Sequence, residues 1–157
     1  MFNIGDKVAY PMHGAGLIEK IEERQILGET RDYYILRIKH GNMQVMVPVS
    51  GAEETGLRSV VCKKDLDAVY KVLASESTPM DENWNRRNRD NMEKLKTGDL
   101  KEVAGVIRNL VRVDREKKLS TGEKKLLNSA RQILSSEMVM VLGIAEDDAM
   151  TMIDRQI

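Results

Sequence analysis

The segment that decides the fold of the first half is residues 32–48, which read DYYILRIKHGNMQVMVP. Its opening residues are rich in β-branched and aromatic side chains, and their later part alternates between apolar and polar. Residues 40–42 (HGN) supply a turn, after which Met43, Val45 and Val47 share one face of a second extended run. Two such runs joined by a turn containing Gly and Asn are typical of a β-hairpin.

Two further extended runs precede this hairpin, at residues 7–10 and 17–22, with turn-rich sequence around them. Several short strands within about 55 residues leave no room for crossover helices, so the sheet should be antiparallel. We therefore expect an α+β protein whose N-terminal part is a small antiparallel β-barrel or a strongly bent sheet. Domains of this kind commonly dock on other proteins, and an open edge strand offers backbone groups to a partner sheet.

The second half changes to a helical period. Apolar residues recur at spacings of three and four over residues 63–74, which predicts a helix there. Residues 75–80 contain Pro79 and should interrupt the helical structure. A longer apolar stripe then predicts another helix, and its members are Leu100, Val103, Ala104, Ile107, Leu110 and Val111.

Capping signals fix where the later helices begin and end. Asp99 and Ser120 each precede a glutamate by three residues, as in a capping box, and each should begin a helix. Gly143 should end the helix that begins at Ser120, and a short last helix is expected over residues 146–156. The second half is therefore predicted to be a compact all-α domain.

Length and composition limit the class of protein. The chain has 157 residues and a single cysteine, which excludes an internal disulfide. No apolar run approaches the roughly 20 residues that a bilayer requires, and the N-terminus lacks the pattern of a signal peptide. We expect a cytoplasmic protein that binds no membrane. Its predicted divisions are a β-rich domain at 1–60, a connecting helix and linker at 61–80, and a helical domain at 81–157.

The charge is balanced overall but uneven along the chain. The 25 Lys and Arg residues equal the 25 Asp and Glu residues. Residues 81–136 nevertheless carry 14 basic and 9 acidic side chains, whereas residues 137–157 carry one and five. Salt screens exposed charges beyond about 8–10 Å, so a local basic patch can meet phosphate groups on a neutral protein. A chance fluctuation in a highly charged sequence explains the same numbers.

The sequence contains no convincing catalytic or metal-binding pattern. His13 and His40 fall in expected turns, and Cys62 stands alone before a helix. The glycines at 14 and 16 lack the remaining residues of a phosphate-binding loop. We therefore expect no catalytic residue, no metal site and no cofactor or small-molecule substrate.

The most unusual segment is residues 81–96, which read DENWNRRNRDNMEKLK. It contains the only tryptophan, Trp84, followed by three arginines within five positions. As a helix it would line up Trp84 with two asparagines and a leucine, which is too polar a stripe for a core helix. One interpretation is that the ring packs on neighbouring helices while the arginines face solvent. The other is that the ring stays exposed and enters a nucleic-acid groove while the arginines bind phosphates.

Four stretches in this order and spacing resemble the CarD family of bacterial transcription regulators, of the CarD/CdnL type. The stretches are GDKVAYPMHG at 5–14, NWNRR at 83–87, EKLKTGD at 93–99 and LSTGEK at 119–124. The first alone is less specific, because the transcription-repair coupling factor carries a similar module. The helical motifs distinguish the two.

The resemblance implies a Tudor-like β domain that binds the RNA polymerase β subunit and a helical domain that contacts promoter DNA, without enzymatic activity. It implies that the open promoter complex is stabilised by a tryptophan wedge at the upstream edge of the melted region. That wedge falls on Trp84, and its basic neighbours fall on Arg86, Arg87, Arg89 and Lys124. On the polymerase side, one family arginine falls on Arg24. Another basic position falls on Met46, which departs from the family pattern and leaves only an apolar contact there.

Alternatives remain at this stage. A protein–protein adaptor would dock through its sheet edge and use Trp84 as an interface anchor, without touching DNA. A monomer is expected, although an open edge strand also allows paired forms. The responding promoters and the sign of regulation are not encoded in any pattern recognised here.

Overall fold

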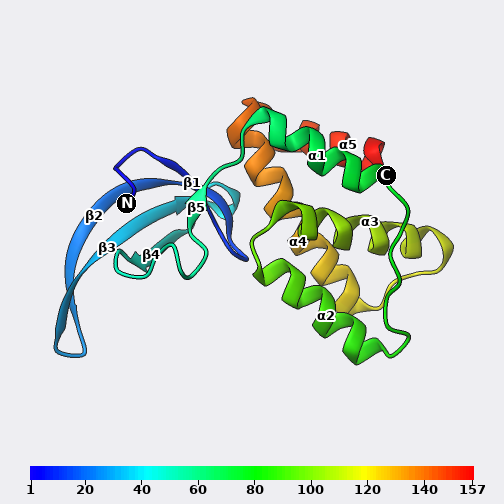
Figure 1. Ribbon diagram of the computed structural model, residues 1–157, viewed down its shortest axis with the longest axis horizontal. Coiled ribbons are helices and arrows are strands. Elements are labelled where there is room, and N and C mark those ends of the chain that lie inside the picture. Colours follow the sequence, from blue (N-terminus) through cyan, green and yellow to red (C-terminus); the bar gives the residue numbers. More distant parts are fainter.

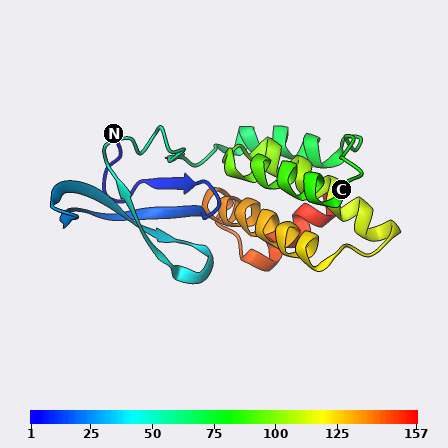
Figure 2. The same cartoon turned by 90° about the horizontal axis from the view of Figure 1, so that it is seen from below.

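The computed structural model describes residues 1–157 as an antiparallel sheet followed by five helices. The sheet lies at one end of the molecule and the helices at the other (Figures 1 and 2). The α+β class predicted from the sequence is confirmed. No helix combines the length and the apolar character needed to cross a membrane.

The sheet has five strands in the spatial order β4-β3-β2-β1-β5. Their bounds are β1 Lys7–Tyr10, β2 Gly14–Ile26, β3 Glu29–Ile38, β4 Gln44–Pro48 and β5 Arg58–Ser59. A short 3₁₀ turn, η1 at His40–Asn42, joins β3 to β4. This is the hairpin expected from residues 32–48, and the pairing of Leu36 with Val45 gives its register.

The sheet is not the closed barrel that was expected. Strand β4 pairs only with β3, and the two-residue strand β5 pairs only with β1, so the two edges of the sheet do not meet. Strands β2 and β3 are also longer than the alternation predicts. Their outer halves form a two-stranded ribbon that projects from the sheet (Figure 1). Such a ribbon has two exposed faces and so needs no apolar–polar alternation.

The alternation along the strands separates two faces of the sheet. One face packs over a core of eight buried residues: Val8, Ile18, Tyr34, Leu36, Ile38, Val47, Ala52 and Leu57. A register shift between Ile18 and Lys20 marks a β-bulge, beyond which the even-numbered residues of β2 face away from this core. This bulge decides which side chains of β2 the sheet presents outward.

The helices are α1 Lys63–Ala74, α2 Trp84–Lys96, α3 Leu100–Glu116, α4 Thr121–Leu142 and α5 Glu146–Gln156. The expected helices at 63–74 and 146–156 are therefore confirmed, and 75–80 contains no helix. Twenty buried residues form one core among them. Helix α1 contributes Leu66, Val69 and Leu73 to that core, so it is packed into the bundle.

The predicted caps begin the later helices. Asp99 accepts a hydrogen bond from the backbone N–H of Lys101 (2.9 Å), and Ser120 Oγ accepts one from that of Glu123 (3.2 Å). Gly143, at φ +67°, ends α4 as expected. The capping box at Ser120 is only half formed, because the Glu123 carboxylate binds another helix instead of the Ser120 backbone.

Candidate nucleic-acid interface

Trp84 begins α2 at the end of the helical bundle and keeps 43% of its surface exposed. Asn83 caps the helix by accepting a hydrogen bond from the backbone N–H of Arg86 at 3.1 Å. Further along α2, Asn91 and Leu95 are buried, so the polar stripe seen in the sequence turns inward. The tryptophan lies at the outer end of this stripe and is only partly covered.

The ring of Trp84 is held by the first turn of α4. Its Nε1 donates a hydrogen bond to Ser120 Oγ at 2.8 Å. The six-membered part of the ring lies against Gly122, where an added Cβ would come within 3.1 Å of Trp84 Cζ2. The indole is thus fixed at its polar edge while part of its surface faces solvent. Both earlier interpretations of Trp84 are partly met, because it packs on a neighbouring helix and stays exposed.

Half-buried Arg87 and buried Glu123 form an ion pair that is connected to this ring through Ser120. Arg87 Nε and Nη2 donate to the two carboxylate oxygens of Glu123 at 2.9 and 3.0 Å. Glu123 is 4% exposed, and Ser120 Oγ donates to its Oε1 at 3.2 Å. The Arg87 hydrogen bonds hold the pKa of Glu123 below its ordinary value although burial opposes this, and the same pair raises the pKa of Arg87. A continuous chain of contacts therefore joins Trp84, Ser120, Glu123 and Arg87.

The remaining predicted cations lie on the surface of the same two helices. Arg86 and Arg89 on α2 and Lys124 in the first turn of α4 are exposed. None of the three belongs to an ion pair, whereas Arg87 does. Their charges are free to meet an anion. The structure thus separates Arg87, which is paired with Glu123, from three exposed and unpaired cations on the same two helices.

The two residues expected on the polymerase side lie on the same face of the sheet, on the two strands that flank β3. Strand register pairs Arg24 with Arg31 and Met46 with Ile35, and the alternation puts Arg24 and Met46 on the outward face. Arg24 Nε and Nη2 both donate to Glu22 Oε2, at 2.9 and 2.7 Å. Hydrogen bonds from Lys20 and then Arg24 lower the pKa of Glu22. Met46 is 39% exposed on β4, the edge strand next to β3.

Groups that could perform catalysis are scattered. No three His, Cys, Asp or Glu side chains gather in a way that could hold a metal ion. His13 Nδ1 lies 3.1 Å from the Pro11 carbonyl oxygen, and His40 Nδ1 lies 3.2 Å from Glu146 Oε1. Cys62 Sγ donates to the Asp65 carboxylate at the start of α1. Each of these contacts is exposed or half-buried.

Sequence reasoning missed the residues that hold the tryptophan. Ser120 and Glu123 were recognised only as a cap, and Gly122 was given no role. The sequence signal for this contact was the LSTGEK stretch at 119–124. There Ser120 and Glu123 form a capping pair, and Gly122 between them has no side chain, so an aromatic ring can approach the helix end closely. The pairing of Glu123 with Arg87, 36 positions earlier, leaves no local signature.

The geometry defines a two-part α+β protein in which an open sheet and a helical end that exposes one indole lie far apart. Two family models match the chain: the "CarD-like/TRCF RID domain" over residues 2–61 and the "CarD, C-terminal domain" over residues 68–154. The first of these is a Tudor-like fold. The chain belongs to the CarD family.

Two individual proteins are similar to it. "Putative transcription factor YdeB" of Bacillus subtilis (strain 168) is 40% identical over 146 residues, which cover 93% of this chain and 95% of that protein. A solved structure described as "CdnLNt from Myxoccoccus xanthus" is 34% identical with a TM-score of 0.33, and the match covers 39% of this chain and 86% of that one.

Proposed function

We propose that this protein is a non-enzymatic transcription regulator that binds the RNA polymerase β subunit through its sheet and promoter DNA through the Trp84 end of its helices. In this role it acts in the cytoplasm, on polymerase at the nucleoid. Membership of the CarD family and the name of the Bacillus relative support the regulatory class.

The observation that carries the proposal is the anchored but exposed indole. A ring that enters a DNA groove must be rigid, because ordering a mobile side chain reduces the free energy gained on binding. Trp84 meets this condition through its hydrogen bond to Ser120 and its contact with Gly122. Apolar wedges of this kind unstack a base step at a cost of a few kcal/mol and are favoured where the duplex is already opening. The upstream edge of a melted promoter is such a place.

The exposed cations on the two helices that hold the ring supply the attraction to DNA. Arg86, Arg89 and Lys124 are exposed and carry no internal partner. Three phosphate contacts would give a salt dependence of about −2.7 in log K against log salt, from about −0.9 per phosphate. Arg87 contributes differently in this proposal, because its guanidinium already binds Glu123 and positions the ring. Such weak intrinsic affinity requires a second attachment that raises the effective concentration near DNA.

The outward face of the sheet supplies that attachment. Arg24 presents a cation and Met46 an apolar side chain on the same face, next to the unpaired edge of β4. The edge strand offers backbone groups for pairing with a partner sheet. Met46 would pack in the interface without the polar contact that a basic residue makes there.

The proposed effect follows from differential affinity. A protein that binds open DNA more tightly than closed DNA shifts that equilibrium by the ratio of the two affinities. A preference of about 1.4 kcal/mol would shift it tenfold at saturation. Activation at one promoter and repression at another are then compatible, since different kinetic steps limit initiation at each.

A promoter-melting assay with purified polymerase tests the proposal. The fraction of open complex is measured with and without the protein at several salt concentrations. We expect a larger open fraction with the protein and a loss of the effect as salt rises. Unchanged melting with the protein bound to polymerase would favour an adaptor that does not touch DNA.

A further inference from the structure

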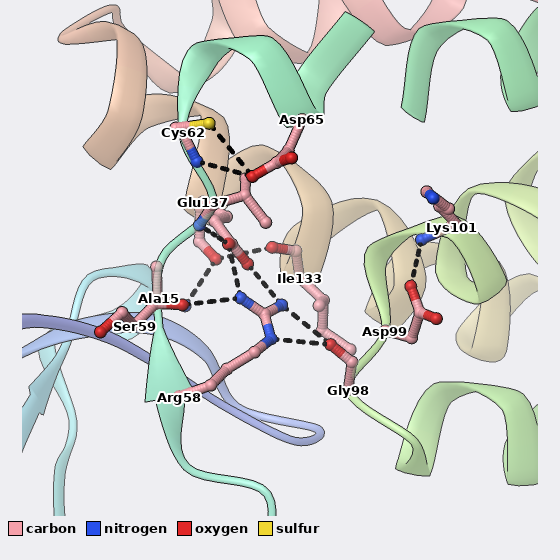
Figure 3. Close-up of polar contacts among 12 residues, drawn as sticks. Ala15, Arg58, Ser59, Cys62, Asp65, Gly98, Asp99, Lys101, Ile133 and Glu137 are labelled. Carbon is pink, nitrogen blue, oxygen red and sulfur yellow. Dashed lines mark hydrogen bonds and ion pairs between the residues drawn. The ribbon is translucent and has the colours of Figure 1, made fainter. Parts of the chain in front are cut away.

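Arg58 of β5 and Glu137 of α4 connect the sheet to the helical bundle. Arg58 Nη1 donates to Glu137 Oε2 at 2.8 Å and Nη2 donates to Oε1 at 3.0 Å. Glu137 is fully buried, and the side chain of Arg58 is 32% exposed. The pair lies where the chain passes from the sheet into α1 (Figure 3). It belongs to neither of the two ends described above.

The same two side chains also form hydrogen bonds with backbone groups of three further residues. Arg58 Nε and Nη2 donate to the carbonyl of Gly98, in the turn between α2 and α3, at 3.3 and 2.8 Å (Figure 3). Arg58 Nη1 also donates to the carbonyl of Ser59 at 3.2 Å. Glu137 Oε2 accepts a hydrogen bond from the backbone N–H of Val61 at 2.8 Å. One ion pair therefore fixes β5, the connection to α1, the α2–α3 turn and α4 relative to one another.

The α2–α3 turn matters because α2 begins with Trp84. The turn follows the last residue of α2, and its Gly98 lies against Pro11 of the β1–β2 turn: an added Cβ on Gly98 would come within 3.1 Å of Pro11 Cγ. A Cβ added to Gly56, in the connection between β4 and β5, would come still closer to the same ring, at 2.5 Å. Pro11 is thus packed against two glycines, both at positive φ, where a side chain would be strained.

The start of β2 is also attached to α4 directly. Ser136 Oγ accepts a hydrogen bond from the backbone N–H of Ala15 at 3.0 Å and donates to the Ile133 carbonyl at 2.8 Å. A Cβ at Gly14 would come within 2.4 Å of the same hydroxyl oxygen. Ser136 and Glu137 are adjacent in α4, so one turn of this helix binds both β5 and β2. A flexible tether would need none of these contacts.

We propose that Arg58 and Glu137 are positioning residues that hold the sheet and Trp84 at one fixed separation. The inference rests on the proposed function, in which the sheet is bound to polymerase and the indole must reach one edge of the melted DNA. Two linked sites reinforce each other only when the linkage places both in register. The buried pair is suited to this, because a bidentate arginine–carboxylate contact has a single preferred geometry.

The first test measures separation without polymerase or DNA. Nitroxide labels are attached at Gln44→Cys on β4 and Asp90→Cys on α2, with Cys62→Ser removing the native thiol. Electron–electron double resonance then gives the distance distribution. We expect one narrow distribution in the parent and a distribution at least twice as wide with Glu137→Gln. A narrow, unshifted distribution in both Glu137→Gln and the milder Arg58→Lys would overturn the proposal.

The second test separates positioning from folding and from binding. Unlabelled Glu137→Gln and Arg58→Lys are compared with Asp154→Asn, which breaks the exposed pair between Asp154 and Arg131 within the bundle. We expect the two junction variants to keep their affinities for polymerase and for fork DNA alone within twofold, while open-complex lifetime falls at least fivefold. Asp154→Asn should change neither. If Glu137→Gln fails to fold, Arg58→Lys carries the comparison, because it keeps the positive charge while it loses the bidentate contact with Glu137 and the fork of donors to the Gly98 and Ser59 carbonyls.

The outcomes distinguish the positioning role of Arg58 and Glu137 from the proposed function. A wide distance distribution with undiminished open-complex lifetime would overturn the positioning role and leave the proposed function intact. A parent protein that has no effect on open complexes would contradict the proposed function, whereas the distance measurement would still report on the junction.

Discussion

The indole N–H of Trp84 donates to the hydroxyl of Ser120 across 2.8 Å, from the first residue of one helix to the cap of another. The same hydroxyl accepts the backbone N–H of Glu123 and donates to its carboxylate. The hydroxyl that holds the exposed ring is therefore also the hydroxyl that caps α4. Position of the ring and stability of the helix end are linked through this one oxygen.

Gly122→Ala should move the ring without unfolding the protein. Alanine raises helix stability relative to glycine by up to about 1 kcal/mol, but its Cβ requires Trp84 Cζ2 to give way by a few tenths of an ångström. We expect an unchanged or slightly higher melting temperature and stronger quenching of indole fluorescence by acrylamide. Open-complex lifetime should fall about threefold, a loss of about 0.7 kcal/mol in binding. Gly105→Ala in α3 is the control, because its Cβ meets only an ordinary contact at 3.7 Å. Equal quenching in both variants would contradict the assigned contact.

Stability should depend on pH through Glu123. Its pKa in the folded state lies below the ordinary value of 4.5, because Arg87 hydrogen-bonds the charged form. The unfolded state therefore takes up its proton first as the pH falls, so this contribution is complete above about pH 4.5 and is lost below it, towards the folded-state pKa. Glu123→Gln should lower the free energy of unfolding by about 2 kcal/mol at pH 7 and by less near pH 3. Urea unfolding of both proteins across this range tests it, and a difference that grows on acidification would be the wrong sign.

Arg24→Glu should weaken polymerase binding. The change reverses a charge on the outward face of the sheet and places a second carboxylate beside Glu22. We expect at least a tenfold loss of affinity for the isolated β subunit, or about 1.4 kcal/mol, in surface plasmon resonance. Arg115→Glu, an exposed arginine near the end of α3, is the matched control and should bind normally. Normal binding of both would remove Arg24 from the interface.

Met46→Ala tests the apolar part of the same face. Met46 is 39% exposed on an edge strand, so burying it against a partner should contribute about 1 kcal/mol and its loss should reduce affinity about fivefold. Met43, which is 51% exposed just before β4, provides the comparison as Met43→Ala. An equal loss of affinity in both variants would indicate nonspecific binding through exposed apolar surface, not a contact at Met46. The readout is again affinity for the isolated β subunit, now at two salt concentrations.

Much of the fold could be predicted because it depends on the local period of apolar residues and on helix-capping residues. The change from period two to a helical period separates sheet from helices, and Asp99, Ser120 and Gly143 mark helix ends through their own backbone preferences. The outer ribbon of β2 and β3 was not predicted, because both of its faces are exposed to solvent and its sequence therefore does not alternate between apolar and polar residues. Closure of the sheet was expected wrongly, because strand count alone does not say whether the edge strands are long enough to meet.

The residues of the candidate site could be selected from the sequence, but their arrangement could not. Trp84 and its cations stand out because they interrupt a helical stripe. The bonds from Trp84 to Ser120 and from Arg87 to Glu123 each join residues 36 positions apart, and those from Arg58 to Glu137 join residues 79 apart. Such pairs depend on how helices pack, which no short-range pattern specifies. Arg87 could therefore not be distinguished from Arg86 and Arg89 by sequence.

The lifetime of open promoter complexes with Trp84→Ala tests the central claim most directly. Complexes are formed with polymerase and saturating protein, challenged with a competitor, and followed by loss of the melted-strand signal. We predict that the wild-type protein lengthens this lifetime at least tenfold over polymerase alone, and that Trp84→Ala removes most of the gain while its affinity for polymerase stays within twofold. An undiminished lifetime with Trp84→Ala would contradict the claim that the anchored indole engages the melted edge.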